Sequence, residues 1–246
     1  MHRTKLKVAL VGNPNSGKST LFNQLTGLNQ KIANFPGVTV EKKSGYFHIR
    51  QSGSKDVVVD LTDLPGTYSL YPKTLEEQIP FRVLCDPLNE SHPDITIIIA
   101  DGTNLKRSLF LCSQIVDLKT PTILAINMMD LVERNGNTID FQKLSKVLGI
   151  PVLPINAREG KGIENLKKAI LSEISIPEND FIDTAFFAPE VVEKIRNSVK
   201  LNSNYAAFQV ANNLESIDFF NNRPERKLKI RCRVSSRLPR LSSAMK

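Results

Sequence analysis

Short apolar runs alternate with segments of helical periodicity along the first 175 residues of the chain. Three of the runs, 6–11, 95–100 and 122–126, are almost continuously apolar. Such runs between helices are typical of parallel strands that helices cover on both faces. The pattern therefore predicts an α/β fold with a doubly wound, mostly parallel sheet. The expected strands are 6–11, 40–49, 55–62, 95–100, 122–126 and 152–155, and the expected helices are 17–25, 75–84, 105–118, 141–148 and 163–174.

One pair of expected strands differs from the rest. Segments 40–49 and 55–62 are rich in β-formers and only five residues separate them, which predicts an antiparallel hairpin. Loops are expected at 29–39, where Asn34 to Gly37 form a turn signal, and at 63–72. Pro80 predicts a kink or restart in its helix.

The pattern changes near residue 176, where a polar break is followed by two helical segments without a strand between them. We expect these at 189–199 and from Tyr205 to Leu214. The predicted organisation is a nucleotide-binding domain over 1–175, a small all-helical domain over 176–222, and a basic tail over 223–246.

Composition is that of a soluble globular protein. No stretch approaches the roughly 20 apolar residues of a membrane helix, and no signal peptide is visible, so a cytoplasmic location is expected. Cys85, Cys112 and Cys232 lack metal-ligand spacing and indicate reduced thiols. His2, His48 and His92 are scattered and predict no iron site.

The net charge of +8 comes entirely from the tail. Residues 223–246 hold nine basic residues against one acid, Glu225, while the rest of the chain is neutral. We expect a solvated tail more than a nucleic-acid or membrane contact, so a nucleic-acid partner is disfavoured. The basic residues are Arg223, Arg226, Lys227, Lys229, Arg231, Arg233, Arg237, Arg240 and Lys246.

The strongest motif is Gly-Asn-Pro-Asn-Ser-Gly-Lys-Ser at 12–19, which matches the phosphate-loop pattern between a strand and a helix. Backbone N–H groups and the helix N-terminus there favour phosphate. Lys18 is expected on the β- and γ-phosphates, and the Ser19 hydroxyl on Mg²⁺. The residues expected to bind nucleotide here are Gly12, Asn13, Pro14, Asn15, Ser16, Gly17, Lys18, Ser19 and Thr20.

A second phosphate-side motif, Asp63-Leu64-Pro65-Gly66, closes the strand at 55–62. The Asp63 carboxylate can hold Mg²⁺ through water, and Gly66 allows its N–H to face the γ-phosphate. We therefore expect all four residues, Asp63, Leu64, Pro65 and Gly66, at the nucleotide.

Two further motifs point to guanine. Asp130, in Asn127-Met128-Met129-Asp130, can accept the N1 and N2 donors of guanine, and Asn127 can tie this loop to the phosphate loop. In Asn156-Ala157-Arg158, the N–H of Ala157 could donate to guanine O6. All four motifs follow expected strands, where ligands of this fold class bind.

The chain resembles the family of ferrous iron transport protein B (FeoB) over about residues 5–220, in its cytosolic GTPase part with the helical domain. The residues that carry the resemblance are the phosphate loop, the segment Ala33 to Glu41, the segment Asp63 to Leu70, and Asn127 to Asp130.

The resemblance implies further roles. Thr39 would join the Mg²⁺ shell, and Asn15 would bind a K⁺ ion together with carbonyls near Ala33 and Phe35. Thr67 stands where Ras-like GTPases have a water-orienting glutamine, so slow hydrolysis is expected without another charge. The implied catalytic residues are Lys18, Asn15, Thr39 and Gly66; the cofactors are GTP or GDP, Mg²⁺ and K⁺.

The implied function is GTP hydrolysis that regulates or drives Fe²⁺ uptake at the cytoplasmic face of the inner membrane. The implied partners are a membrane-embedded permease region or small cytosolic Feo proteins, and an oligomer is an open alternative. The sequence departs from common patterns at Met128, Asn156 and Ala33. It also stops at Lys246, which leaves a truncated chain and a stand-alone GTPase as alternatives.

Two other functions stay open at this stage. One is a cytosolic GTPase of ribosome or tRNA maturation, whose members share Asn15-type loops and can carry basic tails. The other is a nucleotide-binding regulatory module without useful turnover.

Overall fold

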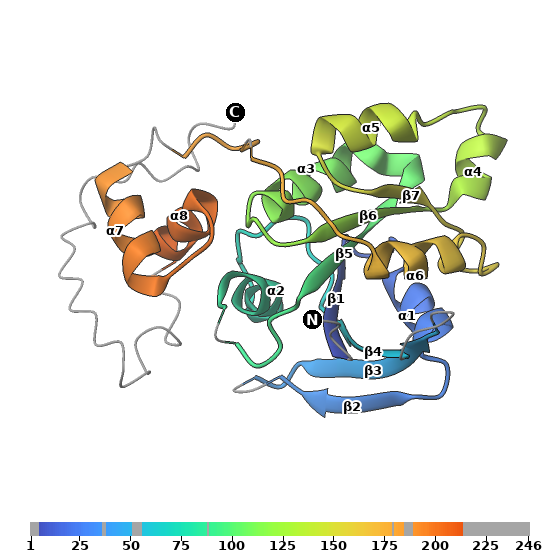
Figure 1. Cartoon of the computed structure of the whole chain (residues 1–246), viewed down its shortest axis with the longest axis horizontal. Helices are drawn as coiled ribbons and strands as arrows, with labels where there is room; N and C mark the ends of the chain where they lie inside the picture. Colours follow the sequence, from blue (N-terminus) through green and yellow to red (C-terminus); the bar gives the residue numbers. More distant parts are fainter. Residues whose placement is uncertain are drawn as a thin grey trace. The chain divides into compact units, whose positions relative to one another are not determined.

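A computed structural model of the chain describes residues 5–35, 38–50, 56–87, 89–178, 180–184 and 189–213. Its contacts divide the chain into two compact units, Met1–Ile182 and Asp183–Lys246. The first unit holds the sheet, and the second holds helices α7 (Pro189–Val199) and α8 (Asn204–Asn212) (Figure 1). The division falls seven residues beyond the expected domain boundary, so residues 176–182 lie in the first unit.

Within the described residues, seven strands form one mixed sheet in the order β2-β3-β4-β1-β5-β6-β7. Strands β2, β3 and β4 pair antiparallel, and the remaining pairs are parallel. The prediction of a mostly parallel sheet with an antiparallel hairpin is confirmed. The strands are β1 (Lys5–Gly12), β2 (Gln30–Asn34), β3 (Glu41–Ile49), β4 (Val57–Asp63), β5 (Ile95–Asp101), β6 (Thr122–Asn127) and β7 (Val152–Pro154).

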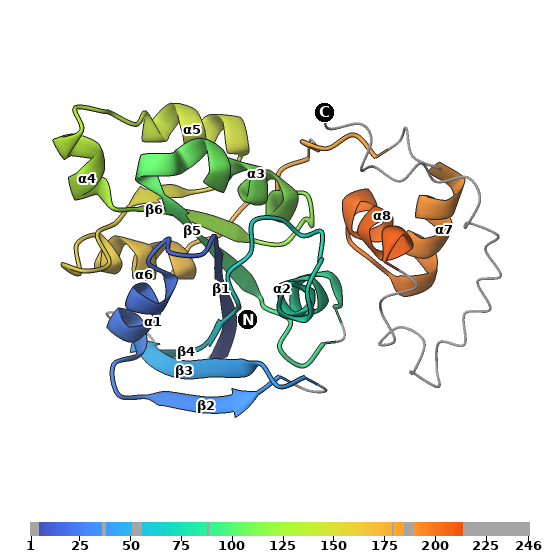
Figure 2. The ribbon, with the colours of Figure 1, turned by 180° about the vertical axis from the view of Figure 1, so that it is seen from behind.

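Helices cover both faces of this sheet. Seen from opposite sides in Figures 1 and 2, α1 and α6 lie on one face, and α2 and α3 lie on the other. The helices of this unit are α1 (Lys18–Thr26), α2 (Leu75–Cys85), α3 (Leu105–Val116), α4 (Met129–Arg134), α5 (Phe141–Leu148) and α6 (Ile163–Leu171), with a short 3₁₀ turn at Gly102–Asn104.

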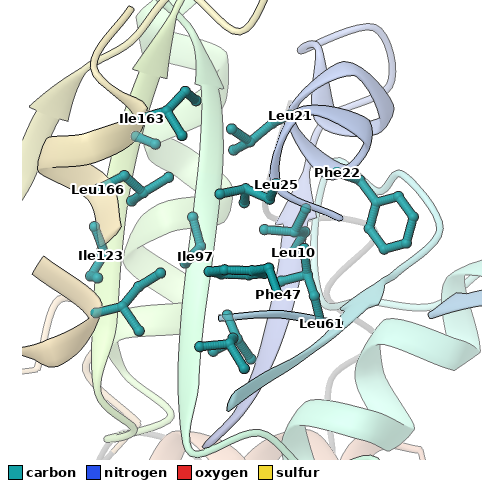
Figure 3. Close-up of a cluster of buried hydrophobic side chains, with 14 of the residues drawn as sticks. Leu10, Leu21, Phe22, Leu25, Phe47, Leu61, Ile97, Ile123, Ile163 and Leu166 are labelled. Carbon is teal, nitrogen blue, oxygen red and sulfur yellow. The ribbon is translucent and has the colours of Figure 1, made fainter. Parts of the chain in front are cut away.

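The core beneath α1 and α6 is continuous across the central strands (Figure 3). Leu10, Leu61 and Ile97 of three neighbouring strands are fully buried. Leu21 of α1 and Leu166 of α6 cover them. Because apolar burial fixes these strands and helices together, the loops at the strand ends have a rigid base.

Two predictions from the hydrophobic pattern were wrong. Strand β2 lies inside the predicted loop 29–39; all five of its residues are exposed and backbone pairing with β3 holds it. An edge strand without a buried face shows no alternation of apolar residues. Helix α4, six residues long, was not predicted because it buries only Val132.

Other boundaries shift slightly. Helix α6 ends at Leu171, before the predicted residue 174, where Ser172 turns to an extended conformation. The turn at Pro36 and Gly37, the hairpin loop at 51–55, Cys232 and the basic tail at 223–246 lie outside the described residues. In the described part of the chain, no helix combines the length and apolar character needed to cross a bilayer.

Candidate nucleotide-binding site

The phosphate loop joins the end of β1 to the start of α1. Gly17, the residue before α1, has φ 90°, and Asn15 has φ 64°. A side chain at Gly17 would also collide with the amide of Asn127. The loop is therefore curled tightly at the N-terminus of α1, where its amides and the helix dipole favour an anion.

Lys18, Ser19 and Asp63 come together beside this loop. The Lys18 ammonium lies 2.5 Å from Asp63 Oδ1, and the Ser19 hydroxyl lies 3.5 Å from Asp63 Oδ2. The side chains of Lys18 and Asp63 are 12% and 6% exposed. An ammonium beside a hydroxyl and a carboxylate is a donor set that fits a phosphate group with Mg²⁺.

The Asp63–Gly66 turn packs directly on the phosphate loop. The N–H of Leu64 donates to Leu10 O, and that of Thr67 donates to Gly12 O, both at 3.1 Å. A Cβ on Gly66 would lie 3.1 Å from the Pro14 nitrogen, so this position has little room for a side chain. The structure thus brings the two phosphate-side motifs together.

Thr67 does not replace a water-orienting glutamine. It is 1% exposed, and its hydroxyl donates to the carbonyl of Ser69 at 2.6 Å. A hydroxyl held in this way faces its own loop.

Asn127 connects three segments. Its Nδ2 donates to Ser16 O at 2.9 Å, and its Oδ1 accepts from Ala157 N–H at 2.9 Å. The residue is 4% exposed. This side chain therefore joins the phosphate loop to both guanine-side motifs.

The second guanine-side loop closes on Asn156, whose Oδ1 accepts from the N–H groups of Arg158 and Glu159, each at 3.1 Å. Because Ala157 N–H already donates to Asn127, the predicted bond to guanine O6 requires that N–H to be shared or released.

A cavity of about 610 Å³ opens between these loops. It contains Asp130, the residue predicted to read guanine. Leu131, Arg134 and Glu159 also line it and were missed from the sequence; Arg134 follows Asp130 by one helical turn, and that spacing could have indicated it. The lining is Gly17, Thr20, Asn127, Met128, Asp130, Leu131, Arg134, Asn156, Arg158 and Glu159.

Thr39 and Asn15 are both exposed. Thr39 lies in the segment between β2 and β3, which is closed by a bond of 3.0 Å from Phe35 N–H to Val40 O. Among the described residues, no hydrogen bond joins Thr39 to the phosphate loop or Asn15 to Ala33 or Phe35. The metal-binding roles of Thr39 and Asn15 stay predictions.

Two buried polar atoms of the phosphate loop have no hydrogen-bond partner among the described residues. They are Asn13 Oδ1 and Ser16 Oγ, and the two residues are 6% and 1% exposed. Buried unpaired groups are costly and concentrate at functional sites. Their position supports this loop as the ligand site.

The described cysteines are structural. Cys85 and Cys112 are free and buried. Burial raises the pKa of the Cys112 thiol to about 12, and burial together with the charge of Asp86 raises the pKa of Cys85 as well. Neither thiol forms the reactive thiolate at neutral pH. The described residues contain no group of three or more His, Cys, Asp or Glu side chains able to hold a metal ion.

The family model described as "Ferrous iron transport protein B" matches residues 6–170. The chain belongs to the FeoB family. The Fe(2+) transporter FeoB of Salmonella typhimurium is 45% identical over 166 residues, which cover 68% of this chain and 21% of that protein. The chain thus spans about a fifth of this curated relative.

Solved structures agree with this family. The G domain of the T. maritima FeoB iron transporter is 41% identical, with a TM-score of 0.60 over 68% of this chain and 97% of that one. The T. maritima cytosolic domain in its GMPPNP form is 34% identical, with a TM-score of 0.68 over 89% and 82% of the two chains. The fold described above is therefore the GTP-binding G-domain fold of FeoB proteins.

Proposed function

We propose that this chain binds GTP with Mg²⁺ and hydrolyses it to GDP and phosphate, with stimulation by K⁺. The observation that carries the proposal is the convergence of Lys18, Ser19 and Asp63 on a phosphate loop that Asn127 ties to a base-sized cavity. The relative solved in a GMPPNP form supports a guanine nucleotide in that cavity.

Nucleotide binding would change the ionic partner of Lys18. When the β- and γ-phosphates take the Lys18 ammonium, the Asp63 carboxylate loses its partner and becomes available beside the Ser19 hydroxyl. The Ser19 hydroxyl and, through water, the Asp63 carboxylate would hold Mg²⁺ there, and the ion would supply positive charge against that of the phosphates. Lys18 and the loop amides then stabilise the transferring phosphoryl group.

Hydrolysis requires in-line attack of water on the γ-phosphate. Thr67 offers no free hydroxyl to orient that water, and Gly66 can present only its backbone N–H. We expect slow turnover from these groups alone. The exposed Asn15 would hold K⁺, which would supply positive charge beside the transferred group, and the Thr39 hydroxyl would join the Mg²⁺ shell.

Base selection rests on Asp130. Its carboxylate accepts the N1 and N2 donors of guanine, whereas adenine presents no such pair at that edge. Adenine would leave the carboxylate without these two donors, so we expect GTP to bind more tightly than ATP.

Family membership supports a role in iron transport. The chain covers only 21% of a curated relative that is named an Fe(2+) transporter. A role of this chain in Fe²⁺ transport is therefore a proposal. We propose that the chain regulates or drives Fe²⁺ uptake at the cytoplasmic face of the inner membrane, through a membrane-embedded region in the same or another chain.

The test is steady-state GTP hydrolysis in KCl and in NaCl at equal ionic strength, with Asn15→Ala and the exposed-site control Asn137→Ala. We expect K⁺ to raise the rate several-fold in the parent and the control but not in Asn15→Ala. GTP affinity, measured separately, should be similar in all three. Equal rates in both salts would overturn the K⁺ role.

Two other outcomes would redirect the assignment. Tight GTP binding without phosphate release under any cation indicates a regulatory module. Salt-sensitive RNA affinity that disappears on deleting residues 223–246 indicates the RNA-linked GTPase.

A further inference from the structure

One face of the sheet carries a concentration of lysines at its β2-β3-β4-β1 end. We define the lysine face as Lys5, Lys7, Lys31 and Lys42, from strands β1, β2 and β3. Strand register places these side chains together, because Lys31 pairs with Ser44, Ser44 with Thr62, Tyr46 with Asp60, and Asp60 with Lys7.

The orientation of this face follows from strand alternation. In β4, Val57, Val59 and Leu61 are buried in the core beneath α1, while the residues between them are half-buried on the other side. The lysine face shares the side of Asp60. A cavity of about 350 Å³ lies here, and all four lysines, Ser44, Tyr46, Asp60, Glu90 and Ser91 are among its lining residues.

Carboxylates offset only part of this charge, because the lining of the cavity has four lysines against the two acids Asp60 and Glu90. Lys5 pairs with Asp60 at 2.8 Å, with both side chains well exposed. Lys7 Nζ donates to the backbone carbonyl of Glu90 at 2.9 Å, and Lys42 Nζ donates to the Ser91 hydroxyl at 2.6 Å. Within the described ranges, Lys7, Lys31 and Lys42 make no ion pair with a carboxylate.

We propose that the lysine face rests on an anionic lipid surface, with lipid phosphates seated in its cavity. Each lysine close to such a surface strengthens attachment by up to about fivefold. Ser44 and Ser91 add hydroxyl donors, and the exposed ring of Tyr46 suits the headgroup level of a bilayer. The choice of lipid over nucleic acid rests on the proposed function beside a membrane transporter.

The experiment is co-sedimentation of the full chain with two kinds of vesicle: pure phosphatidylcholine, and equal parts of phosphatidylcholine and phosphatidylglycerol. The test variant is Lys5→Gln with Lys31→Gln. The matched control is Lys143→Gln with Lys146→Gln, which removes the same charge from exposed positions on α5. The basic tail is present in every protein compared.

We expect the parent and the control to bind the anionic vesicles and not the neutral ones, and the test variant to bind at least tenfold more weakly. Unchanged binding by the test variant would overturn the proposal and assign attachment to another segment. An equal loss of vesicle binding in the test and control variants would overturn the proposal, because it would show that binding depends on net charge and not on the lysine face. The parent could instead bind RNA and not vesicles, with RNA binding lost in the test variant. That result would overturn the lipid proposal and assign the lysine face to nucleic acid.

GDP affinity and melting temperature of all three proteins are measured alongside. They should match, which shows that the variants fold. If the parent binds vesicles but does not hydrolyse GTP, the proposed function is contradicted and the lipid-binding role of the lysine face is retained.

Discussion

Asn127 joins the phosphate loop to the second guanine-side loop through a single side chain. Both ends of its amide are used, one on the carbonyl of Ser16 and one on the N–H of Ala157. Because the residue is buried, removal of the amide leaves these two backbone groups without partners.

Asn127→Ala should therefore lower GDP affinity by about 2 kcal/mol, or about 30-fold, through loosening of both loops. Titration with a fluorescent GDP analogue measures this. The control is the substitution Asn137→Ala, which removes an exposed side-chain amide and should leave the GDP affinity unchanged. A variant of Asn127 that binds as the parent does would show that the tie is dispensable.

Gly17 is constrained twice, by its φ of 90° and by the Asn127 amide that a Cβ would strike. Gly17→Ala should cost about 2 kcal/mol or more in the free energy of unfolding and also weaken nucleotide binding. Gly136→Ala is a matched control, because Gly136 has φ 71° but nothing within 4 Å of its Cβ position. The control should lose about 1 kcal/mol and keep full GDP affinity; equal effects would exclude the clash.

At the scale of elements, the end of α3 holds the segment that leaves the first unit. Asp117 is fully buried, and its carboxylate accepts from Phe181 N–H at 2.9 Å and from Ile182 N–H at 2.8 Å. Nearby, Lys119 Nζ donates to Pro177 O and pairs with Asp180 at 2.8 Å. A short stretch after α3 thus fixes the chain some 60 residues later.

The buried Asp117 gives this attachment a pH dependence. Burial raises the pKa of its carboxyl above 3.8, although the N–H groups of Phe181 and Ile182 oppose the shift. The folded state then keeps the proton to higher pH than the unfolded state, so the free energy of unfolding falls as pH rises from 3.8 through the raised pKa.

Asp117→Asn should remove that part of the slope. It should also cost about 1–3 kcal/mol, because the new amide turns a donor toward a backbone N–H. Denaturant unfolding at a series of pH values measures both effects. The substitution Asp56→Asn, at an exposed position, is the control for the change in net charge. A slope that persists in Asp117→Asn would assign the titration to another group.

At the scale of the whole molecule, the ligand loops rest on one continuous core, so ligand binding should stabilise the sheet unit as a whole. GDP at a hundred times its Kd adds about 2.7 kcal/mol to the free energy of unfolding. For a unit of this size we expect the melting temperature to rise by about 5–10 °C.

Calorimetry with GDP and ADP tests this expectation. ADP should give little shift, and Asp130→Asn should reduce the GDP shift, since it weakens the reading of guanine. An equal shift with both nucleotides would contradict guanine selection by Asp130.

Whether the hydrophobic pattern revealed a strand or helix depends on how much apolar surface that element buries. Strands β5 and β6, and β1 from Val8 onward, are buried on both faces, and their apolar runs predicted them. Strand β2 and helix α4 bury almost nothing, so periodicity could not reveal them. The Asp117 attachment was missed for another reason: a carboxylate after a helix carries no local sign of its distant partners.

The sequence by itself determined the fold class and the order of the nucleotide motifs, because these depend on residue type and local spacing. The motifs predicted that Asn127 ties its loop to the phosphate loop and that Lys18 and Asp63 lie at the same phosphates, but only the tertiary structure decided which atoms make the contacts. Lys18 and Asp63 are 45 residues apart, and Asn127 and Ser16 are 111 apart. Their contacts, like the lysine face, arise from strand order and register, which hydrophobic burial sets across the whole sheet.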